Sequence, residues 1–168
     1  MKILLCGDIN SGKTTLIQRL LADMSAAPRG YITVRMPEVD GVSNVYLYDI
    51  ANPPERVEDA AVIMAISDTG TEKYPERLDT LGVRYLTDIP AGSVVVLDEI
   101  GSLETASPEF QKAVMRILSG DYTVLAAVKA ANTDFLRAVR RHPDCELYII
   151  TPDNRDALYA QLKEEYNI

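Results

Sequence analysis

The strongest constraint on this chain is the junction between its first apolar run, at residues 3–6, and the eight residues that follow. Their sequence is Gly7-Asp8-Ile9-Asn10-Ser11-Gly12-Lys13-Thr14. It matches the pattern G-x-x-x-x-G-K-[ST] at every position. Glycines at the two fixed positions allow successive backbone N–H groups to face one concavity, and a helix beginning near Lys13 would direct its dipole toward bound phosphate. The junction predicts a strand, a phosphate-binding loop and a helix, in that order.

Each part of this loop has an expected task. The predicted nucleotide-binding residues are Gly7, Asp8, Ile9, Asn10, Ser11, Gly12, Lys13, Thr14 and Thr15. Lys13 would reach the β- and γ-phosphates and take part in catalysis, and the Thr14 hydroxyl would bind Mg²⁺.

Four further apolar runs divide the rest of the chain, at residues 62–66, 94–97, 124–128 and 147–150. They are continuous rather than alternating, which is typical of strands buried on both faces. Helical patterns lie between several of them. They cover residues 75–89 and begin at Ser107-Pro108, at Thr133 and at Thr151-Pro152, where Pro152 would be the first helical residue.

Residues 31–36 and 42–50 alternate between apolar and polar side chains, with Asp40-Gly41 in the connection. This pattern predicts a β-hairpin. Elsewhere, strand–helix alternation favours right-handed crossovers and parallel strands. We therefore expect a single α/β domain over residues 1–168, a three-layer P-loop NTPase fold with a mainly parallel sheet and a β-hairpin insertion after the first helix.

Composition excludes several classes of protein. A formal charge of −8 over 168 residues argues against nucleic-acid or anionic-membrane partners. The charge is uneven, because the first 50 residues carry five basic and five acidic groups. No apolar run is long enough to span a bilayer. Cys6 and Cys145 are too few for a disulfide framework, so we expect a reduced, cytoplasmic protein.

A second acidic element follows the run at residues 94–97, which ends in Asp98-Glu99. Asp98 occupies the position of a Walker-B aspartate, at the carboxyl end of a strand, and would bind Mg²⁺ with Thr14. Glu99 could deprotonate a water for attack on the γ-phosphorus, which would make it catalytic. Alternatively, Glu99 caps a loop or pairs with a lysine.

These blocks resemble the cancer-related nucleoside-triphosphatase family, a group of small P-loop NTPases. The resemblance rests on residues 7–15, on Gly30-Tyr31-Ile32-Thr33 with Pro37-Glu38-Val39, on Asp98-Glu99-Ile100-Gly101 with Leu103-Glu104, and on Thr151-Pro152-Asp153-Asn154-Arg155. It implies slow, Mg²⁺-dependent hydrolysis of several nucleoside triphosphates to the diphosphate and phosphate, with weak base selectivity.

The chain departs from that family in three places. Ile9-Asn10-Ser11 stands where members often have proline or another glycine, and Ser102-Leu103 stands where they usually have lysine and methionine. After the next strand Lys129 is the one basic residue, where members tend to carry histidine and several basic residues. These changes leave phosphate and metal binding intact and bear on the turnover rate.

Three other functions remain open at this point. A GTPase switch is disfavoured because residues 131–135 lack the N-K-x-D element that selects guanine. A nucleotide or metabolite kinase would need a basic lid, yet residues 51–76 are acidic and hold Arg56 and Lys73 as their cations. A non-enzymatic nucleotide-binding regulator would keep Lys13 and Thr14 and be indifferent to Glu99.

Additional site residues are expected around the loop. Arg29 or Arg35 would neutralise γ-phosphate charge as an arginine finger, or else cover apolar surface with its stem. Lys129, at the end of the 124–128 run, is a candidate γ-phosphate sensor. Asn154 and Arg155 could contact the base, although a helix N-terminus accounts for them as well.

Overall fold

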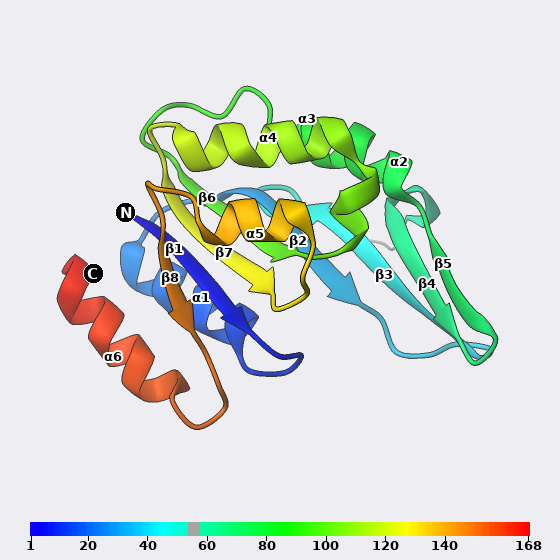
Figure 1. Cartoon of the computed structure of the whole chain (residues 1–168), viewed down its shortest axis with the longest axis horizontal. Helices are drawn as coiled ribbons and strands as arrows, with labels where there is room; N and C mark the ends of the chain where they lie inside the picture. Colours follow the sequence, from blue (N-terminus) through cyan, green and yellow to red (C-terminus); the bar gives the residue numbers. More distant parts are fainter. Residues whose placement is uncertain (54–57) are drawn as a thin grey trace.

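The strand predicted before the phosphate loop is β1 (Lys2–Gly7), an inner strand of an eight-stranded sheet. We describe a computed structural model of the chain over residues 1–53 and 58–168, shown in Figure 1. The other strands are β2 (Arg29–Arg35), β3 (Val42–Asp49), β4 (Val62–Ser67), β5 (Gly70–Lys73), β6 (Val94–Ile100), β7 (Thr123–Lys129) and β8 (Glu146–Ile149). The longer helices are α1 (Lys13–Met24), α4 (Pro108–Ser119), α5 (Asp134–Arg140) and α6 (Arg155–Tyr166).

The strand order is β5-β4-β3-β2-β6-β7-β1-β8. Strands β2, β6, β7, β1 and β8 run parallel, and β3, β4 and β5 extend the sheet in antiparallel fashion beyond β2. The predicted hairpin is therefore confirmed as β2–β3, but its first strand also belongs to the parallel sheet. Because the parallel strands all end at one edge, the segments that follow them gather there.

Helices cover both faces of the sheet and make three layers (Figure 1). Neighbouring residues of β1 show this directly, because Ile3 and Leu5 pack with α1 and α6 while Leu4 packs with α4 and α5. On the α4 side the two largest fully buried side chains are Tyr31 and Phe110, and their ring centroids lie 5.4 Å apart. Alternating burial on two apolar layers confirms the predicted three-layer α/β fold.

Helical structure between residues 75 and 89 is confirmed in shortened form. It consists of α2 (Pro75–Arg77), a π-helical turn η2 (Leu78–Gly82) and α3 (Val83–Tyr85), preceded in the chain by a short 3₁₀ turn η1 (Asp59–Ala61). A second 3₁₀ turn, η3 (Leu103–Ala106), lies between β6 and α4. At α5, Thr133 is the predicted N-cap, and its hydroxyl accepts a hydrogen bond from the Leu136 N–H.

Two apolar runs were wrongly predicted to be strands buried on both faces. β4 is antiparallel to its neighbours, and its last four residues are half-buried. Its apolar residues are consecutive because both faces are covered at its start: Ile63 packs toward α4, and Val62 packs against Tyr46 and Tyr48 on the other face. Among the described residues β8 pairs with β1 alone, and Leu147 and Ile149 are exposed, at 40% and 59%. An edge strand with one covered face leaves such side chains in solvent.

The start of the last helix was also wrongly predicted. Thr151 and Pro152 precede α6, which begins at Arg155. Thr151 and Asn154 instead close a turn between them: the Thr151 N–H donates to Asn154 Oδ1 at 2.8 Å, and the Asn154 N–H donates to Thr151 Oγ1 at 3.3 Å. This side-chain bonding to the backbone offers the segment an alternative to helix.

The junction of the parallel and antiparallel parts of the sheet generates a stability prediction. Gly30 on β2 has a φ of +100°, and a Cβ there would collide with the carbonyl oxygen of Val96 on β6. Gly41 also has a positive φ, +79°, but its Cβ would meet nothing within 4 Å. We expect Gly30→Ala to lower the free energy of unfolding by about 3 kcal/mol or more, and Gly41→Ala by about 1 kcal/mol, measured by urea denaturation.

The matched pair separates backbone strain from steric collision. Equal losses in the two variants would show that the left-handed conformation alone sets the cost, and that the approach of β2 to β6 has no part in it.

Candidate functional site

The loop between β1 and α1 is built on two close approaches. A Cβ at Gly7 would collide with the Ile150 carbonyl oxygen and would lie 2.8 Å from Ser11 Oγ. Gly12, directly before α1, has a φ of +99°. Both positions therefore require glycine, and together they turn the chain from the strand into the helix. This is the predicted strand–loop–helix order.

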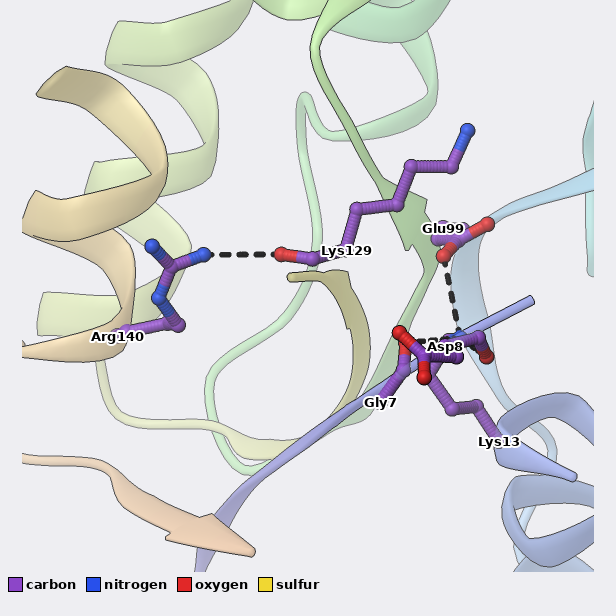
Figure 2. Close-up of polar contacts among 6 residues, drawn as sticks. All are labelled: Gly7, Asp8, Lys13, Glu99, Lys129 and Arg140. Atoms are coloured by element: carbon purple, nitrogen blue, oxygen red, sulfur yellow. Dashed lines mark hydrogen bonds and ion pairs between the residues drawn. The ribbon is translucent and has the colours of Figure 1, made fainter. Parts of the chain in front are cut away.

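Lys13 lies inside the loop that precedes it. Its side chain is 7% exposed, and its ammonium donates hydrogen bonds to the carbonyls of Gly7 and Asp8, both at 2.9 Å (Figure 2). The same ammonium lies 3.4 Å from Glu99 Oε1, which forms an ion pair with it. Lys13 thus links β1, α1 and the end of β6 through a single positive charge.

Asp98 is buried at the carboxyl end of β6, 3% exposed. Burial, the largest effect, raises the pKa of Asp98 to about 6, and the negative charge of Glu99 raises it further. A hydrogen bond from Thr14 and the positive charge of Lys13 both act to lower it. Thr14 is exposed in the first turn of α1. The structure thus brings together the hydroxyl and the carboxylate that were predicted to bind Mg²⁺.

Glu99 follows at the same strand end and faces the cavity. The Oε1 atom of Glu99 is buried and forms the ion pair with Lys13. Within residues 1–53 and 58–168 it has no hydrogen-bond donor. The interpretation of Glu99 as a lysine partner is therefore correct for this arrangement, and the free acceptor capacity is compatible with the catalytic one as well.

A cavity of about 600 Å³ lies over these groups. The lining residues follow the order of the strands in the sheet: Arg155 lies after β8 and the phosphate loop after β1. Lys129 comes next on β7, and Asp98 and Glu99 on β6. Beyond β6 the wall continues onto β2, β3 and β4. The apolar part of this wall consists of Val45, Ile63, Met64 and Ile66, with Leu103 from η3. One cavity therefore joins the phosphate loop to an apolar wall.

The four additional predicted residues separate into two groups. Arg35 and Lys129 line the cavity, and Arg35 Nε donates to Ser43 Oγ at 3.0 Å. Arg29 begins β2, at the opposite edge of the sheet from the loop, and is absent from the described lining. Asn154 donates to the Ile149 carbonyl at 2.9 Å and stabilises the turn before α6. Arg56, considered above for a lid, lies outside the described residues.

The packing of Arg155 and the burial of Glu104 at the cavity could not be inferred from the sequence around them. Arg155 packs over Gly12, where a Cβ would lie 2.6 Å from its Cδ, and its buried Nε has no hydrogen-bond partner in the described part of the chain. Glu104 in η3 is 4% exposed. Burial raises the pKa of Glu104, against the nearby N–H groups of Gly101 and Glu104 and the charge of Lys129. A glutamate in a polar loop gives no sequence signal for such burial.

The described residues hold neither a ready-made metal cluster nor a helix that could span a membrane. Residues 1–53 and 58–168 contain no group of three or more His, Cys, Asp or Glu side chains that could by themselves hold a metal ion. Within those same ranges, every helix is too short or too polar to cross a membrane. A metal at Thr14 and Asp98 would therefore take further ligands from elsewhere.

Known proteins resemble this chain in sequence and in fold. Residues 2–163 match a family model described as NTPase. The chain is 32% identical over 171 residues to nucleoside-triphosphatase THEP1 of Thermofilum pendens, covering 96% of this chain and 93% of that protein. It is 27% identical to nucleoside-triphosphatase THEP1 of Methanothermobacter thermautotrophicus, with 96% and 94% covered.

A solved structure supports the same architecture. The crystal structure of THEP1 from the hyperthermophile Aquifex aeolicus superposes with a TM-score of 0.73 over 96% of each chain, at 21% sequence identity, which is evidence for the fold. The family match extends over nearly the whole chain and includes the loop, the acidic strand end and the closing turn. This protein therefore belongs to the NTPase family and has the P-loop NTPase fold.

Proposed function

We propose that this protein hydrolyses nucleoside triphosphates, ATP and GTP among them, to the diphosphate and phosphate. The observation that carries the proposal is the meeting of Lys13, Thr14, Asp98 and Glu99 at one end of a single cavity. Slow turnover and weak base selectivity are part of the proposal. They follow from the family resemblance and from the departures at residues 9–11 and 102–103.

Phosphate binding would use the loop backbone, the α1 N-terminus and Lys13. The Lys13 ammonium has two carbonyl partners and one carboxylate partner, Glu99. A γ-phosphate oxygen carries more charge than a carbonyl and would compete with Glu99 for this ammonium. Nucleotide binding would then release the Glu99 carboxylate within reach of the γ-phosphate.

Mg²⁺ fits the donor set at this position. Thr14 and Asp98 supply one hydroxyl and one carboxylate, and Mg²⁺ in nucleotide sites commonly takes its other ligands from phosphate oxygens and water. When bound, Mg²⁺ would neutralise charge that develops on the β- and γ-phosphate oxygens. Asp98 and Thr14 would hold the ion.

Glu99 would act on the water. The carboxylate would accept a proton from a water in line with the γ-phosphorus, so that the new P–O bond forms as the bond to the β-phosphate oxygen breaks. Once a γ-phosphate has displaced it from Lys13, the buried Oε1 of Glu99 would have no hydrogen-bond donor among the described residues and would be available to accept that proton.

Charge supports the assignment of partners. The formal charge of −8 disfavours nucleic acid and anionic membranes, whereas the cationic groups Lys13, Arg35, Lys129 and Arg155 line the cavity itself. Cys6 and Cys145 are both free, which supports a cytoplasmic location.

A second candidate function is phosphoryl transfer to an organic acceptor. The apolar wall on β3 and β4 favours it, because a cavity that needed to hold only water beside the γ-phosphate would not require such a surface. A metabolite kinase would place its acceptor there. The acidic strand end at Glu99 is the observation that favours water instead.

Glu99→Gln tests the proposal most directly. Loss of the general base is expected to lower kcat for phosphate release by about 10²-fold or more, with nucleotide affinity retained. The rate is measured with ATP, GTP, CTP and UTP. Glu164→Gln, an exposed substitution on α6, is the matched control and should match the parent.

Parent-like hydrolysis by Glu99→Gln would reject its role with water. Transfer of labelled γ-phosphate to an added nucleoside or nucleoside monophosphate, faster than release to water, would favour the kinase function over hydrolysis.

We expect the Mg²⁺ dependence of phosphate release to depend on the Asp98 carboxylate. EDTA should abolish phosphate release and Mg²⁺ should restore it, and Asp98→Asn should raise the Mg²⁺ concentration for half-maximal rate by at least about 10-fold. The measurement is a Mg²⁺ titration at fixed nucleotide. Asp68→Asn, in the exposed turn between β4 and β5, should leave that concentration unchanged; an equal shift in both variants would contradict the assignment.

Arg155 is expected to bind nucleotides regardless of base. Its guanidinium lies against Gly12 and lines the cavity, so Arg155→Ala should weaken binding of all four β,γ-imido triphosphates by about 10-fold, the value of one charge-assisted hydrogen bond. Calorimetric titration measures it, with exposed Arg141→Ala as the control. A loss restricted to one base would instead assign Arg155 to base recognition.

A further inference from the structure

Glu104 is a buried acidic side chain that the proposed reaction does not yet use. It is 4% exposed, lines the cavity, and its Oε2 atom is buried with no hydrogen-bond partner in the part of the chain that the structure describes. Burying a carboxylate without a full set of partners costs several kcal/mol by general estimates. Such a cost at a cavity wall indicates a group reserved for function.

The basic side chain of Lys129 lies near Glu104, on the same residue, Gly101. A Cβ built on Gly101 would lie 3.5 Å from Glu104 Oε2, 3.1 Å from Lys129 Cδ and 3.5 Å from Lys129 Cε. The carboxylate and the lysine stem therefore lie against the same small residue, two positions after Glu99. A side chain at position 101 would separate them.

Both residues are fixed from behind by the helices on that face. Gln111 of α4 donates to the Glu104 carbonyl at 2.8 Å, as does the Ser107 N–H at 2.9 Å. Arg140 of α5 donates to the Lys129 carbonyl at 2.9 Å. In Figure 2 that carbonyl faces Arg140 while the Lys129 side chain extends away from it, on the side where Glu99 lies. The backbones are held, and the terminal bonds of Lys129 are free to orient its ammonium.

The two basic groups near the γ-phosphate position differ in their partners. Lys13 has Glu99 and two carbonyls, whereas Lys129 has no ion pair with a described residue. Lys129 needs a counter-charge to remain in the cavity rather than extend into solvent, since an unrestrained lysine side chain loses much rotamer freedom when it is ordered. Glu104 Oε2 is a buried acceptor without a described hydrogen-bond partner, and it lies beside Gly101 as the Lys129 stem does.

We propose that Glu104 is a positioning residue for Lys129: it holds the ammonium at the γ-phosphate end of the cavity, so that Lys129 neutralises charge as phosphate departs. This inference rests on the proposed hydrolysis at Glu99. Glu104 itself touches neither the nucleotide nor the water; it acts through the lysine.

A double-mutant cycle with the full chain tests the proposal. Lys129→Met is expected to lower kcat by about 10²-fold, as expected for loss of one preorganised charge in a phosphoryl-transfer site. Glu104→Gln is expected to lower kcat by about 10-fold, as for loss of an orienting partner, with little change in KM or in β,γ-imido-ATP affinity. In the double variant kcat should equal that of Lys129→Met alone.

Stability provides an independent readout. Gln has nearly the same shape as Glu and carries no buried charge, so Glu104→Gln should keep or raise Tm while it lowers kcat. Glu109→Gln and Lys112→Met, which break an exposed ion pair on α4, form the control cycle and should change neither kcat nor its coupling.

Three outcomes would overturn the inference: an unchanged kcat in Glu104→Gln, losses that multiply in the double variant, or a fall in Tm together with lost nucleotide binding. A slow Glu99→Gln beside a parent-like Glu104→Gln would reject this inference and leave the proposed hydrolysis standing. A parent-like Glu99→Gln would reject the hydrolysis instead, whatever Glu104→Gln does.

Discussion

The Lys13 ammonium holds the site together, because its three contacts join the elements that any nucleotide chemistry here requires. Two of its partners are carbonyls of the loop after β1, and the third is the Glu99 carboxylate at the end of β6. β7 separates these two strands in the sheet, so no backbone ladder connects them directly. One buried charge therefore sets the spacing between the phosphate loop and the acidic strand end.

The remaining charges of the cavity follow from that arrangement. Asp98, Glu99 and Glu104 place three carboxylates on one stretch of chain, and burial raises the pKa of the first and the last. Their repulsion and desolvation are tolerable only beside cations, which Lys13 and Lys129 supply from the neighbouring segments. The site is thus balanced locally, in a protein whose total charge is strongly negative.

Features set by residues close together in the sequence could be predicted, whereas features set by contacts between distant segments could not. The loop, its flanking strand and helix, the β2–β3 hairpin and the Thr133 cap follow from spacing and turn chemistry within a few residues. The burial of β4 depends on tyrosines of another strand, and the exposure of β8 depends on its place at the sheet edge. Likewise, Glu104 is buried because η3 packs against α4. The residues next to Glu104 in the sequence do not indicate this packing.

The burial of the Lys13–Glu99 pair has a consequence for ionic strength. Salt screens exposed charges over roughly 10 Å at 0.1 M and affects buried pairs far less. With side chains 7% and 23% exposed, this pair keeps its attraction in salt, while the acidic outer surface loses much of its repulsion toward an approaching polyanion. We therefore expect nucleotide association to tolerate moderate salt better than the association of polyanions with proteins that attract them to a basic surface.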